Sequence, residues 1–153
     1  MTLPDEVDVL IIDDDPLEVE LLLRSLGGIW PADRIGVARD GEEALDFLLA
    51  RGAFRHRRTA NLPRLVLLDF KLPRLDGPEV LRAIRSNPRS STTPVVMLTS
   101  SAEPREIAQC YHLGANSCVE KPVVFSDFRS VLQDLGRYWL GVNQTNQVPT
   151  SLS

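Results

Sequence analysis

The chain has 153 residues, of which 43% are hydrophobic and 25% charged, and its formal net charge is -4. These values are ordinary for one globular domain, and the negative charge argues against nucleic acid or an anionic membrane as partner. No apolar run is long enough to cross a bilayer, and the acidic N-terminus lacks the basic region of a signal peptide. We therefore expect a cytoplasmic protein in which Cys110 and Cys118 are reduced thiols.

Five short apolar runs alternate with five segments in which apolar residues recur at helical spacing. The apolar runs are residues 7–12, 34–38, 64–68, 95–98 and 115–119. The helical segments are residues 16–26, 42–50, 79–85, 104–113 and 125–135. Because strands that alternate with helices form parallel sheets, this order predicts an α/β fold with a five-stranded parallel sheet.

Local signals define the first of these helices. Asp15 is placed to cap it, Pro16 suits its first turn, and Gly27 is placed to end it. The spacing puts Leu17 on the apolar face of this helix and Phe125 on the apolar face of the last one.

Charged residues follow three of the predicted strands at the point where each strand ends. Asp13, Asp14 and Asp15 follow the first strand, Asp69 follows the third, and Lys121 follows the fifth. In an open parallel sheet, ligands bind at the carboxyl ends of the strands, where the winding of the chain reverses. Carboxylates and one ammonium at this edge would form a site for a hard divalent cation and a phosphoryl group.

Four motifs resemble those of the receiver domain of two-component response regulators. They are IIDDDP, LVLLDFKLPRLDG, PVVMLTSS and GANSCVEKPV, in the receiver order and at receiver distances over about residues 7–135. The resemblance implies a flavodoxin-like fold of five βα units, with strand order 2-1-3-4-5 and helices on both faces. Residues 1–137 would then be the receiver domain, and residues 138–153 an uncharged C-terminal extension.

The same resemblance implies roles for the residues at the strand ends. Asp69 is expected to accept a phosphoryl group from the histidine of a kinase. The expected Mg²⁺ ligands are Asp13 (largely through water), Asp14, Asp69 and the main-chain carbonyl of Lys71. Thr99 is expected to hydrogen-bond a phosphoryl oxygen, and Lys121 to pair with the acyl phosphate. Capture of the new charge by these two side chains would make phosphorylation a two-state switch.

Three features concern how such a switch would work in this chain. Cys118 stands where receivers usually carry an aromatic side chain that turns inward as the second part of the switch. The sequence therefore does not predict an aromatic movement of this kind here. Lys71 lies two residues after Asp69, and we hypothesise that it affects the lifetime of the phosphorylated form. By resemblance, the Lys121–Pro122 bond is expected to be cis.

Two further segments narrow the resemblance. DGEEALDFLLARG and FSDFRSVLQDLGRYWLGVNQ look like stand-alone receivers that pair with bacterial and cyanobacterial phytochrome histidine kinases, so a bacteriophytochrome-type kinase is the expected partner. The extension begins with four apolar and aromatic residues, Tyr138, Trp139, Leu140 and Val142. We expect them to build a symmetric homodimer with the last helix; folding back onto their own domain is the alternative.

The loop before the third strand is unusually basic. It carries Arg51, Arg55, His56, Arg57 and Arg58. We expect these side chains to be solvated, with contact to an acidic partner as the alternative.

The expected function is that of a phosphoacceptor that has no output domain and acts through protein contacts, and two other functions are alternatives to it. A phosphohydrolase of the haloacid dehalogenase type also places Asp-x-Asp after its first strand, here Asp13 and Asp15 with Asp13 as nucleophile. The Thr that usually follows is absent, and Asp69 would have no role. A receiver-like binding module without phosphorylation has no support, because every key group is present. We therefore expect a signalling protein rather than an enzyme.

Overall fold

The computed structural model describes residues 3–57, 62–101 and 103–146. Arg58 and residues 147–153 of the expected extension lie outside the described residues. The strands are β1 (Val9–Ile12), β2 (Ile35–Ala38), β3 (Leu65–Asp69), β4 (Val95–Thr99) and β5 (Ser117–Glu120). The α-helices are α1 (Pro16–Gly27), α2 (Gly41–Leu48), α3 (Gly77–Ser86), α4 (Pro104–His112) and α5 (Phe125–Gly136).

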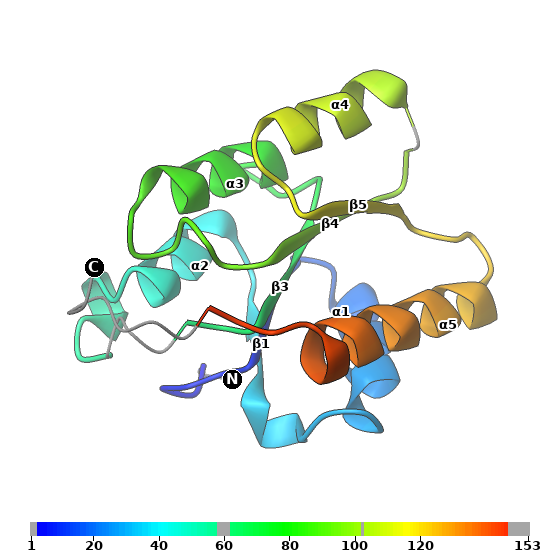
Figure 1. Ribbon diagram of the computed structural model, residues 1–153, viewed down its shortest axis with the longest axis horizontal. Coiled ribbons are helices and arrows are strands. Elements are labelled where there is room, and N and C mark those ends of the chain that lie inside the picture. Colours follow the sequence, from blue (N-terminus) through cyan, green and yellow to red (C-terminus); the bar gives the residue numbers. More distant parts are fainter. Residues whose placement is uncertain (1–2, 58–61, 102, 147–153) are drawn as a thin grey trace.

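The strands form one parallel sheet in the order β2-β1-β3-β4-β5. This order confirms the predicted fold class. Helices α1 and α5 cover one face of the sheet, and α2, α3 and α4 cover the other (Figure 1). The result is a three-layer domain in which every strand has its carboxyl end at the same edge.

Side chains that alternate along a strand supply the cores on the two faces. In β1, Val9 and Ile11 pack with α1 and α5, whereas Leu10 and Ile12 pack with α2 and α3. Strands β1, β3 and β4 are buried along their whole length. Buried parallel strands read as continuous apolar runs for this reason, which is why these strands could be located from the sequence.

Three local expectations were wrong. Leu17 is 77% exposed and Phe125 is 60% exposed, although both were placed on apolar helix faces. Each lies in the first turn of its helix, and the buried residues of both helices begin further along the chain, at Val19 and Phe128. The Lys121–Pro122 bond is trans, since the described residues contain no cis peptide. The two isomers of such a bond differ by only about 1 kcal/mol, so sequence does not decide between them.

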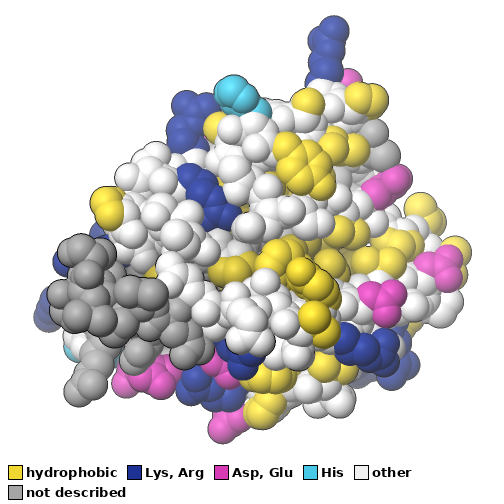
Figure 2. All heavy atoms as spheres, in the orientation of Figure 1, with side chains coloured by type: hydrophobic (Ala, Val, Ile, Leu, Met, Phe, Trp, Pro, Cys, Tyr) yellow, Lys and Arg dark blue, Asp and Glu magenta, His cyan; other side chains and the backbone are white. Residues whose placement is uncertain are grey.

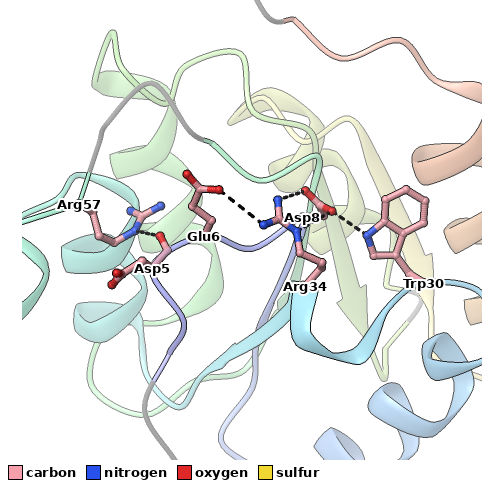
Figure 3. A network of polar contacts seen from close by, with 6 residues as sticks. All are labelled: Asp5, Glu6, Asp8, Trp30, Arg34 and Arg57. Carbon is pink, nitrogen blue, oxygen red and sulfur yellow. Dashed lines mark hydrogen bonds and ion pairs between the residues drawn. The ribbon is translucent and has the colours of Figure 1, made fainter.

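Polar contacts fasten the N-terminal segment at the edge of the sheet opposite the carboxyl ends (Figure 3). Asp8, just before β1, accepts hydrogen bonds from Trp30 at 2.9 Å and from Arg34 at 2.9 and 3.1 Å. Arg57 donates to the main-chain oxygens of Asp5 and Phe47. Its guanidinium also lies 3.6 Å from the centroid of the Phe47 ring.

The expectation of a fully solvated basic loop was therefore wrong for Arg57. Its side chain is buried because two carbonyl oxygens and an aromatic face replace water around the guanidinium. Arg51 and Arg55 are exposed, as predicted.

The chain continues past α5 in a π-helical turn, Arg137–Val142, that packs on the domain. Leu140 is 3% exposed and belongs to the core between the sheet, α1 and α5. Its carbonyl accepts a hydrogen bond of 2.9 Å from Arg64. Trp139 is partly buried against the same core, whereas Tyr138 and Val142 remain exposed. The first part of the extension thus folds back in part, which was the alternative expectation.

Within the described ranges, no helix has the length and apolar character needed to cross a membrane.

Candidate functional site

A cleft lies at the carboxyl ends of the strands, with a volume of about 520 Å³. It is lined by Asp14, Asp15, Pro16, Glu18, Asp69, Phe70, Lys71, Ser100 and Lys121. These residues come from the segments that directly follow β1, β3, β4 and β5, and from the start of α1. The sheet topology therefore brings together residues that are more than one hundred positions apart in the sequence.

Three carboxylates gather at the centre of this edge. Oxygens of Asp13, Asp14 and Asp69 all lie within 4.8 Å of one another. Because β1 and β3 pair in register, with Ile12 opposite Leu68, the next residues along the chain, Asp13 and Asp69, meet side by side. Asp13 and Asp69 are buried, whereas Asp14 is exposed to the cleft.

Lys121 reaches the cluster from the end of β5. Its backbone N–H donates to the carbonyl of Thr99 at 2.7 Å, which extends the β4–β5 ladder by one step. Its Nζ donates to Oδ1 of Asp69 at 2.6 Å and forms a second ion pair with Oε1 of Glu18. The ammonium is thus held between two carboxylates from different elements.

Burial sets the protonation of the cluster. The pKa of Asp13 is raised to about 8, mainly by burial and also by Glu18 and Asp69, whereas the hydrogen bond from the Asp15 backbone acts in the opposite direction. Burial also raises the pKa of Asp69, although Lys121 works in the opposite direction. For Lys121, burial disfavours the charge, but Asp69 and Glu18 together leave the pKa raised. Lys121 therefore keeps its positive charge. The surrounding carboxylates share this charge, and a proton can neutralise a carboxylate that the ammonium does not reach.

The donor set fits a hard divalent cation. Oδ2 of Asp13 is buried and receives no hydrogen bond from the described residues, so a buried acceptor is left without a donor. Carboxylate oxygens within a few ångströms of one another are ligands that Mg²⁺ prefers, and a cation would relieve their repulsion. Asp14 lines the open cleft.

Thr99 was expected to face the phosphoryl group. It is buried at the end of β4, and its hydroxyl oxygen accepts from the N–H of Ser101 and donates to the Ser101 carbonyl, both at 3.1 Å. The neighbouring residue that lines the cleft is Ser100. Thr99 thus organises the β4–α4 loop here, and contact with a phosphoryl oxygen would require this loop to move.

Cys118, in the position expected to carry an aromatic side chain, has an aromatic neighbour from α4. Its backbone N–H donates to the hydroxyl of Tyr111 at 3.2 Å. Both cysteines of the chain are free, as predicted.

The geometry disfavours the dehalogenase-type interpretation. The side chain of Asp15 accepts a hydrogen bond from Leu17 at 3.0 Å and caps α1, so it has a local structural role. Asp69, which that interpretation leaves unused, lies in the cleft with its carboxylate bonded to Lys121.

Glu18 is a charged cleft residue that sequence reasoning missed. It stands three positions after the helix cap Asp15, where an acidic residue usually folds back onto the backbone at the start of the helix. The capping pattern therefore did not predict an ion pair between Glu18 and Lys121. The separation of 103 residues between the two partners cannot be bridged by local sequence rules.

Comparison with known proteins identifies the class. Residues 9–133 match the response regulator receiver domain family. A probable methanogenesis regulatory protein, FilR2 from Methanothrix harundinacea, is 36% identical over 90% of this chain and 86% of its own length. The chain therefore belongs to the response regulator receiver domain family, as the motifs predicted.

Solved structures narrow the likeness to phytochrome-associated relatives. The bacteriophytochrome response regulator AtBRR is 42% identical, with a TM-score of 0.69 over 92% of this chain and 100% of that one. The phosphorylated cyanobacterial phytochrome response regulator RcpA has a TM-score of 0.84 at 27% identity, over 92% and 98%. The Mn²⁺-bound response regulator Rcp1, a Synechocystis protein, has a TM-score of 0.82 at 29% identity, over 90% and 97%.

Family membership has a direct functional meaning. Response regulator receivers are generally phosphoacceptor signalling proteins of two-component systems, and they bind Mg²⁺ at an acidic pocket. The cluster of Asp13, Asp14 and Asp69 is consistent with that pocket.

Proposed function

We propose that this chain is a single-domain response regulator that accepts a phosphoryl group on Asp69 from a histidine kinase, in a reaction that requires Mg²⁺. The observation that carries the proposal is the 2.6 Å contact between Asp69 and Lys121, at the centre of a carboxylate cluster in an open cleft. A nucleophilic oxygen and a cation that can follow the incoming phosphoryl group are thereby placed together.

The chain's own groups divide the work of the transfer. Lys121 opposes the effect of burial on Asp69 and so favours the ionised carboxylate that attacks phosphorus. As the bond from phosphorus to the donor nitrogen breaks and the bond to Asp69 forms, Lys121 passes from the carboxylate to a phosphoryl oxygen. Asp13, Asp14, Asp69 and the main-chain carbonyl of Lys71 would hold Mg²⁺, which neutralises charge on the phosphoryl oxygens.

Thr99 completes the proposed switch. Its hydroxyl is bonded within the β4–α4 loop, and exchange of these bonds for a phosphoryl oxygen would draw the loop toward Asp69. Output through protein contacts would follow from this movement, and a cytoplasmic location stays a prediction.

Intact mass tests the proposed chemistry. The protein is incubated with acetyl phosphate and Mg²⁺, beside Asp69→Asn and a sample with EDTA. One added phosphoryl group that is absent from both controls is the expected result. A folded wild-type protein without any adduct, under conditions in which a known receiver is labelled, would contradict it. An adduct retained in Asp69→Asn would move the acceptor elsewhere, with Asp13 the first candidate.

The rim of the cleft supports a protein as phosphoryl donor. Four large exposed hydrophobic side chains closely follow lining residues in the sequence: Leu17 comes directly after Pro16, and Val123, Val124 and Phe125 come shortly after Lys121. Exposed apolar side chains gathered around a reactive centre usually mark a protein contact. We therefore assign this rim to the kinase domain that presents the phosphorylated histidine.

A substitution at the rim separates docking from chemistry. Val123 is fully exposed, so Val123→Glu is expected to leave folding and labelling by acetyl phosphate unchanged. Transfer from a phosphorylated histidine kinase is expected to slow by about tenfold or more, a loss of about 1.4 kcal/mol of docking energy. Equal transfer rates for wild type and variant would rule out this rim as the docking surface.

The proposed kinase is of the bacteriophytochrome type, because AtBRR and RcpA are named as phytochrome response regulators. FilR2 has a different regulatory name at 36% identity, so the assignment needs its own test. Transfer from a purified bacteriophytochrome kinase is expected to be at least about tenfold faster than from a histidine kinase of another sensory class. Equal rates would remove the phytochrome assignment and leave the phosphoacceptor function intact.

We also propose a homodimer built from α5 and the segment that follows it. Hydrophobic side chains gather on the face around β5, between α4 and α5 (Figure 2), and Tyr138 and Val142 are exposed in the turn after α5. Truncation before Tyr138 would also remove the buried Leu140, so surface substitutions give a cleaner test. Tyr138→Ser with Val142→Ser is expected to convert a dimer to a monomer in light scattering, whereas an undiminished dimer would contradict the proposal.

A further inference from the structure

Glu18 has no role in the proposed transfer, yet it lies in the cleft and is largely buried. Its side chain is 18% exposed, and that of its ion-pair partner Lys121 is 11% exposed. Its carboxylate also helps to raise the pKa of Asp13. A carboxylate on α1 thus contacts the same ammonium that pairs with Asp69.

The usual structural role of a residue in this position does not explain this placement. In a capping box, the acid at the third helical position accepts the backbone N–H of the cap residue. Here the N–H of the cap residue, Asp15, donates instead to Oδ1 of Asp13 at 2.9 Å. Glu18 is therefore directed into the cleft, away from the end of the helix.

The position of Glu18 affects how much positive charge the cleft offers to a ligand. Lys121 is shared between Glu18 and Asp69, so only part of its charge is available to a phosphoryl oxygen. Glu18 also adds one negative charge beside Asp13, Asp14 and Asp69. A negative charge at this place attracts a divalent cation and repels a phosphoryl anion, and both effects are strong in a partly buried site.

We propose that Glu18 is a positioning residue that holds the Lys121 ammonium and sets the balance between divalent cation and phosphoryl group in the cleft. The inference rests on the proposed function of this cleft. Its signature is that removal of the charge shifts the two affinities in opposite directions. Structural damage to the cleft would weaken both.

The test compares Glu18→Gln with wild type, with Glu20→Gln as the matched control. Glu20 lies on the same helix and pairs with Arg24 on the exposed surface, so its variant has the same change in net charge. Calorimetric titration of the unphosphorylated proteins with Mg²⁺ gives the first readout. The rate of phosphorylation by acetyl phosphate, at Mg²⁺ that saturates every variant, gives the second. Thermal unfolding verifies that each variant is folded.

Glu18→Gln is expected to bind Mg²⁺ about three- to tenfold more weakly and to be phosphorylated about three- to tenfold faster. Glu20→Gln is expected to match wild type in both measurements. Glu18→Asp, which keeps the charge, is expected to stay closer to wild type than Glu18→Gln in both.

Any other pattern overturns the inference. If Glu18→Gln loses both Mg²⁺ affinity and phosphorylation rate, the residue is structural; if either quantity is unchanged, Glu18 does not set the balance. If wild type takes up no phosphoryl group, the proposed function is wrong, whatever the role of Glu18. The Mg²⁺ titration then still decides the role of Glu18, because an unchanged affinity in Glu18→Gln would exclude it.

Discussion

Raising the pH in the absence of divalent cations is expected to destabilise this protein, because of Asp13. Burial raises the pKa of this carboxyl to about 8, helped by Glu18 and Asp69 and opposed by the N–H of Asp15. In the unfolded chain the same group has its ordinary pKa of about 3.8. The folded protein therefore retains a proton at Asp13 over a pH range in which the unfolded chain has lost it.

The sign and size follow from proton linkage. A folded pKa above the unfolded one gives stability that is fully present below the unfolded pKa and is lost as pH rises through the folded pKa. Between pH 5 and pH 8, each pH unit lowers the free energy of unfolding by about 1.4 kcal/mol for one such group. The expected loss is thus up to about 4 kcal/mol, and it levels off above pH 8. The raised pKa of Asp69 acts in the same direction.

Urea unfolding in EDTA at pH 5, 6.5 and 8 measures this loss, with Asp13→Asn as the control. The variant has no carboxyl to titrate at this position, so its stability should change far less with pH. With saturating Mg²⁺ the wild-type loss should shrink, because the cation binds the ionised form and releases a proton on binding. A wild-type stability that changes by less than about 1 kcal/mol, or an equal loss in Asp13→Asn, would refute the reasoning.

Three further predictions concern packing and lifetime. Leu140→Ala should lower the free energy of unfolding by about 2–5 kcal/mol in urea, because the side chain is buried in the core; the exposed Val142→Ala should cost less than about 0.5 kcal/mol. A similar small cost for both would mean that the turn after α5 is not part of the domain. Gly77→Ala should cost about 1–3 kcal/mol and slow phosphorylation, because a Cβ there would lie 2.4 Å from the carbonyl oxygen of Asp69; unchanged unfolding and labelling would contradict this. Lys71→Ala should lengthen the half-life of the phosphorylated form several-fold, because an ammonium lining the cleft stabilises charge on the phosphoryl oxygens during hydrolysis. An unchanged half-life would exclude Lys71 from that step.

The parts of this fold that could be predicted are those in which local and global requirements agree. Strands β1, β3 and β4 are buried on both faces, so their sequences are apolar throughout and the residues that end them are easily located. Because parallel strands end at one edge, the placement of Asp14 and Asp69 in one cleft followed from the ends of β1 and β3, and that of Lys121 from the end of β5. The structure brings them together as predicted.

The expectations that failed depend on contacts that no local pattern contains. Arg57 looked like any other loop arginine, and its burial results from the carbonyls of Asp5 and Phe47, which only the folded chain places around it. Leu17 has the correct spacing for an apolar face, but in the folded chain its side chain, in the first turn of α1, is exposed.

Glu18 shows why such failures gather at the site. A buried carboxylate beside other carboxylates costs stability, and local rules predict arrangements that avoid this cost. The apolar strands around the cleft are stable enough to hold Asp13, Glu18 and Asp69 together despite their repulsion. That repulsion is relieved by a proton, by a divalent cation or by the ammonium of Lys121. The same strained arrangement that lowers stability at high pH is therefore what makes the cleft responsive to a cation and to a phosphoryl group.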